Sequence, residues 1–119
     1  MPAPLIIDPQ AIENLRALTP GDNDEFLREI VGIFLEDTPR RIAELEQSLA
    51  GNDPLCFTRA AHSVKGSSSN LGAMALRAVA ERLELQSKQS GLTGVEPILA
   101  ELKGEFASAA AALRQILKP

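Results

Sequence analysis

The chain contains a single histidine, His62, and the residues that follow it are unusual for a helix. Residues 60–72 read AAHSVKGSSSNLG, so that a glycine, four serines and an asparagine fall within the eight residues after the imidazole. Compared with alanine, these six residues cost a helix on the order of 3–4 kcal/mol. Because alanine-rich sequence on both sides still predicts a helix, the segment needs an explanation other than helix stability.

On a helical wheel, His62 lies opposite the apolar residues of its own segment. At 100° per residue, Lys65, Gly66 and Ser69 fall within about 60° of it. The core side, at roughly 100–180° from His62, consists of Phe57, Ala61, Val64, Ser68 and Leu71. We therefore expect the imidazole to point away from the core, with an ammonium, bare backbone and a hydroxyl beside it.

Nucleophilic chemistry fits these residue types. A histidine with an ordinary pKa of about 6.5 is mostly neutral at pH 7, and its free ring nitrogen can accept a phosphoryl group. Lys65 offers a point charge for phosphoryl oxygens, and Gly66 lets a partner's backbone approach the ring. Neither GxxxxGK[ST] nor GxGxxG occurs in the sequence, so the phosphoryl group would have to come from another protein.

Charge is distributed unevenly along the chain. The net charge is −4, which argues against nucleic acid as a partner. Residues 1–53 contain eleven acids and four bases, whereas residues 54–80 contain three bases and no acid. An acidic protein with an acid-free segment around its only histidine indicates that this segment meets an anionic partner.

Cysteine use and hydropathy limit the class of protein. Cys56 is the only cysteine, which excludes an internal disulfide, fits a reducing cytosol and leaves too few ligands for zinc. No apolar run is long enough to span a membrane, and the first residues do not resemble a signal peptide. We expect a single cytoplasmic domain over residues 1–119, without a cofactor, a bound metal or a membrane contact.

The sequence predicts an all-α fold, an antiparallel up-down four-helix bundle with a short extra N-terminal helix as a lid. Apolar periodicity and Gly/Pro signals place the helices at about residues 8–18, 22–50, 54–71, 73–90 and 93–117. The apolar arc of the second helix is wide, which predicts cover from two sides.

Several helix boundaries carry specific signals. The Asp-Pro pairs at residues 8–9 and 53–54 predict N-caps followed by proline in the first turn. The pairs Asp22/Glu25 and Thr93/Glu96 have capping-box spacing. Pro39 lacks a backbone donor, so we expect the second helix to kink there or to restart with Thr38 as its cap.

The segment AAHSVKGSSSNLGA resembles the signature of histidine-containing phosphotransfer (HPt) domains. In that family an A-H-x-(hydrophobic)-K-G core is followed by small residues and then by (hydrophobic)-G-A, and every element is present here. The resemblance covers most of the chain, because FLREIVGIFLEDTPRRIAELEQSLAGND is similar to the family's preceding helix and LRAVAERLE to its following helix.

The resemblance implies a role for each of five residues. His62 would be the phosphorylation site, Lys65 would steady the phosphoryl oxygens, and Gly66 would leave room for the partner. Glu84 matches the position from which the family hydrogen-bonds the other imidazole nitrogen, where a carboxylate would orient the ring. Ser69 is a weaker candidate for a phosphate or partner hydrogen bond.

The resemblance also implies partners. Such domains do not bind ATP or phosphorylate themselves but relay a phosphoryl group between receiver-domain aspartates in a two-component phosphorelay. The expected partners are response-regulator receiver domains and a hybrid sensor histidine kinase, with Mg²⁺ on the receiver. A closed bundle predicts a monomer. Leu55 and exposed apolar residues of the second helix could complete the docking contact.

Other functions fit parts of the sequence. A histidine kinase dimerisation domain has an acid after its histidine, where this chain has Ser63. The phosphoacceptor domain of a chemotaxis-type or hybrid kinase has a very similar signature and would belong to a longer polypeptide. A non-catalytic helical adaptor with a vestigial histidine is disfavoured by the combination of His62, Lys65 and Gly66.

Overall fold

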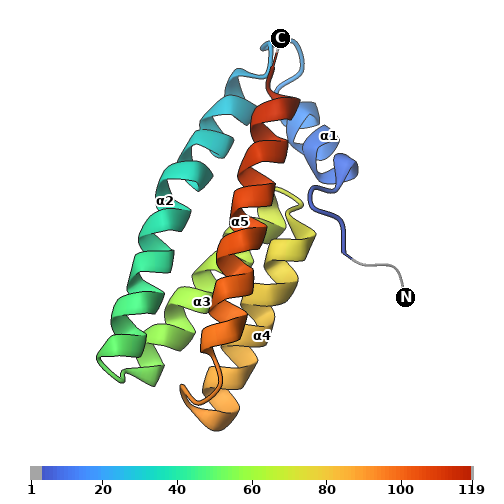
Figure 1. Ribbon diagram of the computed structural model, residues 1–119. Coiled ribbons are helices and arrows are strands. Elements are labelled where there is room, and N and C mark those ends of the chain that lie inside the picture. Colours follow the sequence, from blue (N-terminus) through green and yellow to red (C-terminus); the bar gives the residue numbers. More distant parts are fainter. Residues whose placement is uncertain (1–3, 119) are drawn as a thin grey trace.

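Within residues 4–118, which the computed structural model describes, the chain is all-helical. Four long helices alternate in direction as an antiparallel bundle, and a short helix lies across one end (Figure 1). This confirms the predicted architecture. Residues 1–3 and 119 of the predicted domain lie outside the described residues. The helices are α1 (Pro9–Leu18), α2 (Glu25–Ala50), α3 (Pro54–Asn70), α4 (Met74–Ser90) and α5 (Glu96–Ile116).

Both Asp-Pro signals begin a helix as predicted. The Asp8 carboxylate accepts a hydrogen bond from the Gln10 backbone N–H at the start of α1. The Asp53 carboxylate accepts from the Cys56 N–H at the start of α3. Each bond satisfies a backbone donor that has no partner within its helix.

The predicted start of α2 at Asp22 is wrong by three residues. Asn23 and Asp24 have positive φ angles, so the chain turns before the helix begins at Glu25. The carboxylate of Asp22 accepts instead from the N–H groups of Asp24 and Phe26. Because of this left-handed turn, the capping box that the spacing of Asp22 and Glu25 predicts does not form.

The predicted cap of α5 and the predicted restart of α2 at Thr38 are both wrong. α5 begins at Glu96 with the buried Val95 at its N-cap, where no side chain caps the helix, so Thr93 does not cap it. α2 runs without a break across Pro39, and Thr38 is buried at 1% exposure rather than capping a new helix. Core packing on both sides of the proline keeps α2 continuous despite the missing backbone donor.

The core is aliphatic and rich in alanine. Small residues let α3 and α4 pack closely, and the buried Ser68 donates its hydroxyl to the Val64 carbonyl one turn earlier, as predicted. Tilted rings of Phe34 and Phe106, 5.7 Å apart, join α2 to α5. The side chains buried to 1% exposure or less include Leu27, Val31, Leu45, Phe57, Ala61, Val64, Leu71, Leu76, Leu83 and Leu102.

The wide apolar arc of α2 is covered only in part. Leu27, Val31 and Phe34 are buried, and α1 packs against α2. Ile33 stays 58% exposed, next to a groove between α2 and α3. The prediction that this helix is covered from two sides therefore fails at Ile33.

The turn between α3 and α4 holds α1 in place. Gly72 has a φ of +69°, and its carbonyl accepts a 2.8 Å hydrogen bond from the Asp8 N–H. A Cβ on Gly72 would lie 2.6 Å from the Cβ of Ala11. Glycine is needed there both for its backbone conformation and for the close approach of α1.

We expect Gly72→Ala to destabilise the protein by at least about 2 kcal/mol, because backbone strain of roughly 1–2 kcal/mol adds to a clash with α1. Gly21→Ala is the matched control, since Gly21 also has a positive φ but a Cβ there meets nothing within 4 Å. Urea unfolding measures both variants. Equal losses in the two would contradict the close packing of α1 on this turn.

Candidate functional site

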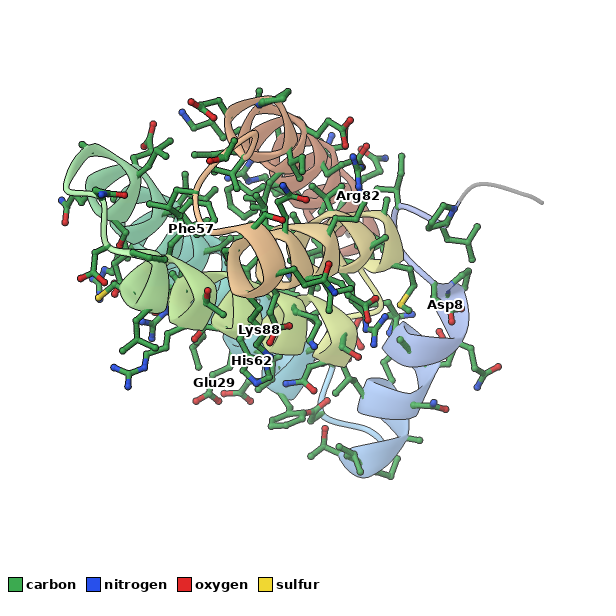
Figure 2. The ribbon with its side chains drawn as sticks, turned by 90° about the horizontal axis from the view of Figure 1, so that it is seen from below. Asp8, Glu29, Phe57, His62, Arg82 and Lys88 are labelled. Atoms are coloured by element: carbon green, nitrogen blue, oxygen red, sulfur yellow. The ribbon has the colours of Figure 1, made fainter. Side chains whose placement is uncertain are left out.

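His62 lies on the outer face of the bundle. Its side chain is 66% exposed, and its Nδ1 is 2.8 Å from Oε2 of Glu84 on the neighbouring helix α4. Figure 2 shows the imidazole on the outside of α3, with Lys88 of α4 nearby. The helical-wheel prediction that His62 points away from the core is confirmed.

The orientation of the imidazole follows from the packing of α3. Phe57, Ala61 and Val64 are each 0% exposed and fix the opposite side of the helix in the core. Since side chains three and four positions apart share a face, His62 must lie outside. The same packing against α4 brings Glu84 within hydrogen-bond distance of the ring.

Glu84 is a buried carboxylate that makes several charged contacts. Its side chain is 5% exposed, Lys65 Nζ lies 2.7 Å from Oε1, and Lys88 Nζ lies 3.4 Å from Oε2. Burial by itself raises the pKa of Glu84. The Lys65 ammonium and the His62 imidazole have the larger opposite effect, and together they lower the pKa from 4.5 to about 2. The carboxylate is therefore ionised at neutral pH.

An ionised Glu84 determines which imidazole nitrogen is reactive. A carboxylate only accepts hydrogen bonds, so we assign the ring proton to Nδ1. The lone pair of the neutral ring is then on Nε2, and the side chain that carries it is mostly exposed. The site thus presents a nucleophilic nitrogen to the outside of the bundle.

Lys65 lies beside His62, as the sequence predicts, but its ammonium is not free. It contacts Glu84, and the Lys65 side chain is only 24% exposed. One carboxylate therefore holds both the imidazole and the lysine. The sequence placed Lys65 next to the ring but gave no sign of this ion pair.

Gly66 and Ser69 leave the surface beside His62 open. Gly66 is exposed, and a Cβ at this position would meet nothing within 4 Å. Packing within the chain therefore gives no reason for glycine at a helical position where alanine is more stable. Ser69 is exposed one turn further along α3.

Sequence reasoning missed the contacts that hold Glu84 from its own helix. Ser87 is buried, and its hydroxyl bonds to the carbonyl of Glu84 and to Thr58 on α3, 2.7 Å away. Lys88 joins Leu55, Arg59 and Ser63 around a shallow pocket at the imidazole. The i,i+4 spacing of Glu84 and Lys88 was the available signal for the latter contact.

A second hollow lies on the α2 side of α3. Exposed Ile33 and half-buried Asp37 from α2 line it together with Ser67 and Asn70 from α3 and the buried Leu71. Its lining is mostly apolar. Its exposed apolar surface comes from α2, next to the helix that carries His62.

Residues 4–118 contain neither a candidate metal centre nor a candidate membrane span. That part of the chain has no cluster of three or more His, Cys, Asp or Glu side chains suited to a metal ion. None of its helices combines the length and apolar character needed to cross a bilayer.

The sequence matches a known family over most of its length. Residues 29–115 match the family described as Hpt domain. The chain belongs to the Hpt domain family. This match includes His62, Lys65, Gly66, Ser69 and Glu84 within its range, and it confirms the resemblance seen in the sequence.

One curated relative is similar to most of this chain. The chain is 29% identical over 96 residues to Multistep phosphorelay regulator 1 of Schizosaccharomyces pombe, a match that covers 81% of this chain and 32% of that protein. The chain thus spans about a third of the length of this curated relative.

Solved structures share the fold. Histidine-containing phosphotransfer protein B (HptB) from Pseudomonas aeruginosa PAO1 matches with a TM-score of 0.85 and 25% identity, covering 94% of both chains. Histidine-containing phosphotransfer protein MtHPt2 from Medicago truncatula matches with a TM-score of 0.80 and 20% identity, covering 94% of this chain and 76% of that one. At 20% identity the second likeness supports the fold alone.

The lowered pKa of Glu84 predicts an acid-dependent loss of stability. A shift from 4.5 to about 2 corresponds to about 3 kcal/mol of stabilisation, which is complete above pH 4.5 and is lost as the pH falls towards 2. Glu84→Gln cannot titrate. Urea unfolding should show the stability difference between the wild type and this variant shrinking over that range, and a constant difference would contradict the assignment.

Proposed function

We propose that this chain is a phosphotransfer intermediate of a two-component phosphorelay, with His62 as its phosphoacceptor. Membership of the Hpt domain family supports the phosphorelay role. The observation that carries the site assignment is the exposed imidazole whose Nδ1 is held by a buried, ionised Glu84. This contact leaves Nε2 as the acceptor atom.

The proposed step transfers a phosphoryl group from a receiver-domain aspartyl phosphate. The lone pair of Nε2 forms a bond to phosphorus, the bond from phosphorus to the aspartate oxygen breaks, and its electron pair stays on the donor carboxylate. Because the Nδ1 proton is retained, the phosphorylated ring carries a positive charge. Glu84 faces that charge at 2.8 Å, and the reverse step passes the phosphoryl group to the next receiver.

Three neighbouring residues complete the proposed site. Lys65 is one turn from His62, and its ammonium can turn from Glu84 towards the phosphoryl oxygens. Gly66 leaves space for the receiver's backbone, and Ser69 is a candidate hydrogen-bond donor to the phosphate or to the partner. The exposure of both agrees with these roles.

The proposed partners are response-regulator receiver domains and a hybrid sensor histidine kinase. The receiver supplies the aspartate and Mg²⁺, and this chain supplies no ATP site. Exposed Leu55, at 61% exposure, and Ile33 are the apolar residues we propose for docking. We propose that residues 1–119 act as one monomeric cytoplasmic domain.

A module of a larger protein is the second candidate. The chain matches only a third of the length of its S. pombe relative, so the same domain can serve within a longer polypeptide. A chemotaxis-type or hybrid kinase would then phosphorylate His62 within its own assembly. In both cases the acceptor atom and the four supporting residues are the same.

We expect the purified protein to take up acid-labile phosphate when it is mixed with a phosphorylated receiver and Mg²⁺. His62→Gln should abolish the label, because no other histidine exists in the chain. Ser63→Ala, which changes the adjacent position, should keep it. Label that persists in His62→Gln would refute the acceptor assignment, and an adaptor would bind the receiver without taking up label.

Substitutions at Gly66 separate helix stability from partner access. We expect Gly66→Ala to stabilise the folded protein by about 0.5–1 kcal/mol, because alanine favours a helix. Gly66→Leu should slow transfer by about tenfold or more, which is 1.4 kcal/mol or more in the barrier, because the side chain blocks the receiver.

Gly104→Ala provides the matched control for these variants. Gly104 is also an exposed helical glycine whose Cβ would meet nothing within 4 Å, but it lies on α5. It should gain similar stability and transfer at the wild-type rate. Wild-type transfer by Gly66→Leu would show that this glycine does not serve the partner.

A further inference from the structure

Glu84 has more cationic neighbours than a single ion pair requires. Its Oε1 faces Lys65 at 2.7 Å, and its Oε2 faces both His62 at 2.8 Å and Lys88 at 3.4 Å. The two lysines differ in exposure, since the Lys65 side chain is 24% exposed and that of Lys88 is 58% exposed. One ammonium is thus enclosed at the carboxylate, and the other approaches it from solvent.

The proposed function places two demands on Lys65. In the unphosphorylated protein its ammonium neutralises a carboxylate that is only 5% exposed. After transfer, the nearest strong anion is the phosphoryl group on His62, and Lys65 is expected to turn towards it. The phosphorylated imidazolium still faces Oε2, but Oε1 loses the ammonium that it contacted, which is unfavourable for a carboxylate shielded from water.

Lys88 is placed to relieve this conflict. It lies one helical turn after Glu84 on α4, and its ammonium is already close to Oε2, just beyond normal hydrogen-bond distance. The turn between them is fixed because the buried Ser87 bonds to Thr58 on α3. A small movement of the exposed lysine chain would bring its ammonium into direct contact with the carboxylate.

We propose that Lys88 is a positioning residue whose ammonium pairs with the Glu84 carboxylate when Lys65 turns to the phosphoryl group. This inference rests on the proposed function, because it concerns the phosphorylated state of His62. Lys88 acts through Glu84 and keeps that carboxylate ionised and bonded to Nδ1–H. It does not itself bind the phosphoryl oxygens.

The proposal predicts an effect on only one of the two states. In the unphosphorylated protein Lys65 already neutralises Glu84, so an exposed, loosely paired Lys88 contributes little. In the phosphorylated protein Lys88 becomes the ammonium that pairs with this carboxylate, beside the imidazolium already at Oε2. Removing it should therefore shift the phosphoryl group towards the receiver without destabilising the unphosphorylated fold.

The first experiment measures the equilibrium of phosphoryl transfer between a receiver and the full chain in the presence of Mg²⁺. We expect Lys88→Met to shift it towards the receiver by about five- to tenfold, equivalent to about 1–1.4 kcal/mol. Lys88→Arg should restore it. Lys103→Met is the matched control, since it removes the same charge from a lysine paired with exposed Glu46 on α2, and it should have no effect.

The second experiment repeats Lys88→Met in a Glu84→Gln background. The amide oxygen of glutamine can still accept from Nδ1–H but needs no cation, so Lys88→Met should then have no effect on the equilibrium. An equal shift in both backgrounds would overturn the proposal in favour of direct phosphoryl contact. No shift in the Glu84 background would also overturn it. Failure of the wild type to take up label would instead refute the proposed function.

Discussion

The hydrogen bond between His62 Nδ1 and the buried carboxylate of Glu84 is the contact on which the site depends. It holds the ring in one orientation and leaves the other nitrogen facing solvent. The carboxylate can stay ionised at 5% exposure because the Lys65 ammonium and the His62 imidazole stabilise its charge. A neutral acid at this position could donate its proton to the ring nitrogen and would then favour the opposite tautomer.

The bundle supplies this contact through the close packing of α3 on α4. Alanines and the buried Ser68, which satisfies its own hydroxyl on Val64, keep the helix surfaces flat enough to approach. The Thr58–Ser87 bond fixes the register one turn from the imidazole. The costly run of small residues after His62 therefore serves two purposes, with tight packing on one side of α3 and an open surface on the other.

Apolar periodicity and the Gly/Pro signals in the sequence predicted the five helices, the orientation of His62 and the Asp-Pro helix starts, because these features depend on residues close in the chain. The predicted capping boxes at Asp22 and Thr93 did not form. A left-handed turn at Asn23 and Asp24 precedes α2, and the buried Val95 is the N-cap of α5. The ion pair of Lys65 with Glu84 was not predictable from spacing, because it joins two helices. Only the family signature pointed to Glu84.

The protonation of the His62 ring tests this account most directly. Nitrogen-15 NMR distinguishes the two ring nitrogens, and the proton that each carries can be assigned at a pH where the ring is neutral. We expect the proton on Nδ1, and, after phosphorylation, a phosphorus–nitrogen coupling at Nε2. A neutral ring protonated at Nε2, or a phosphoryl group attached to Nδ1, would contradict the role of Glu84.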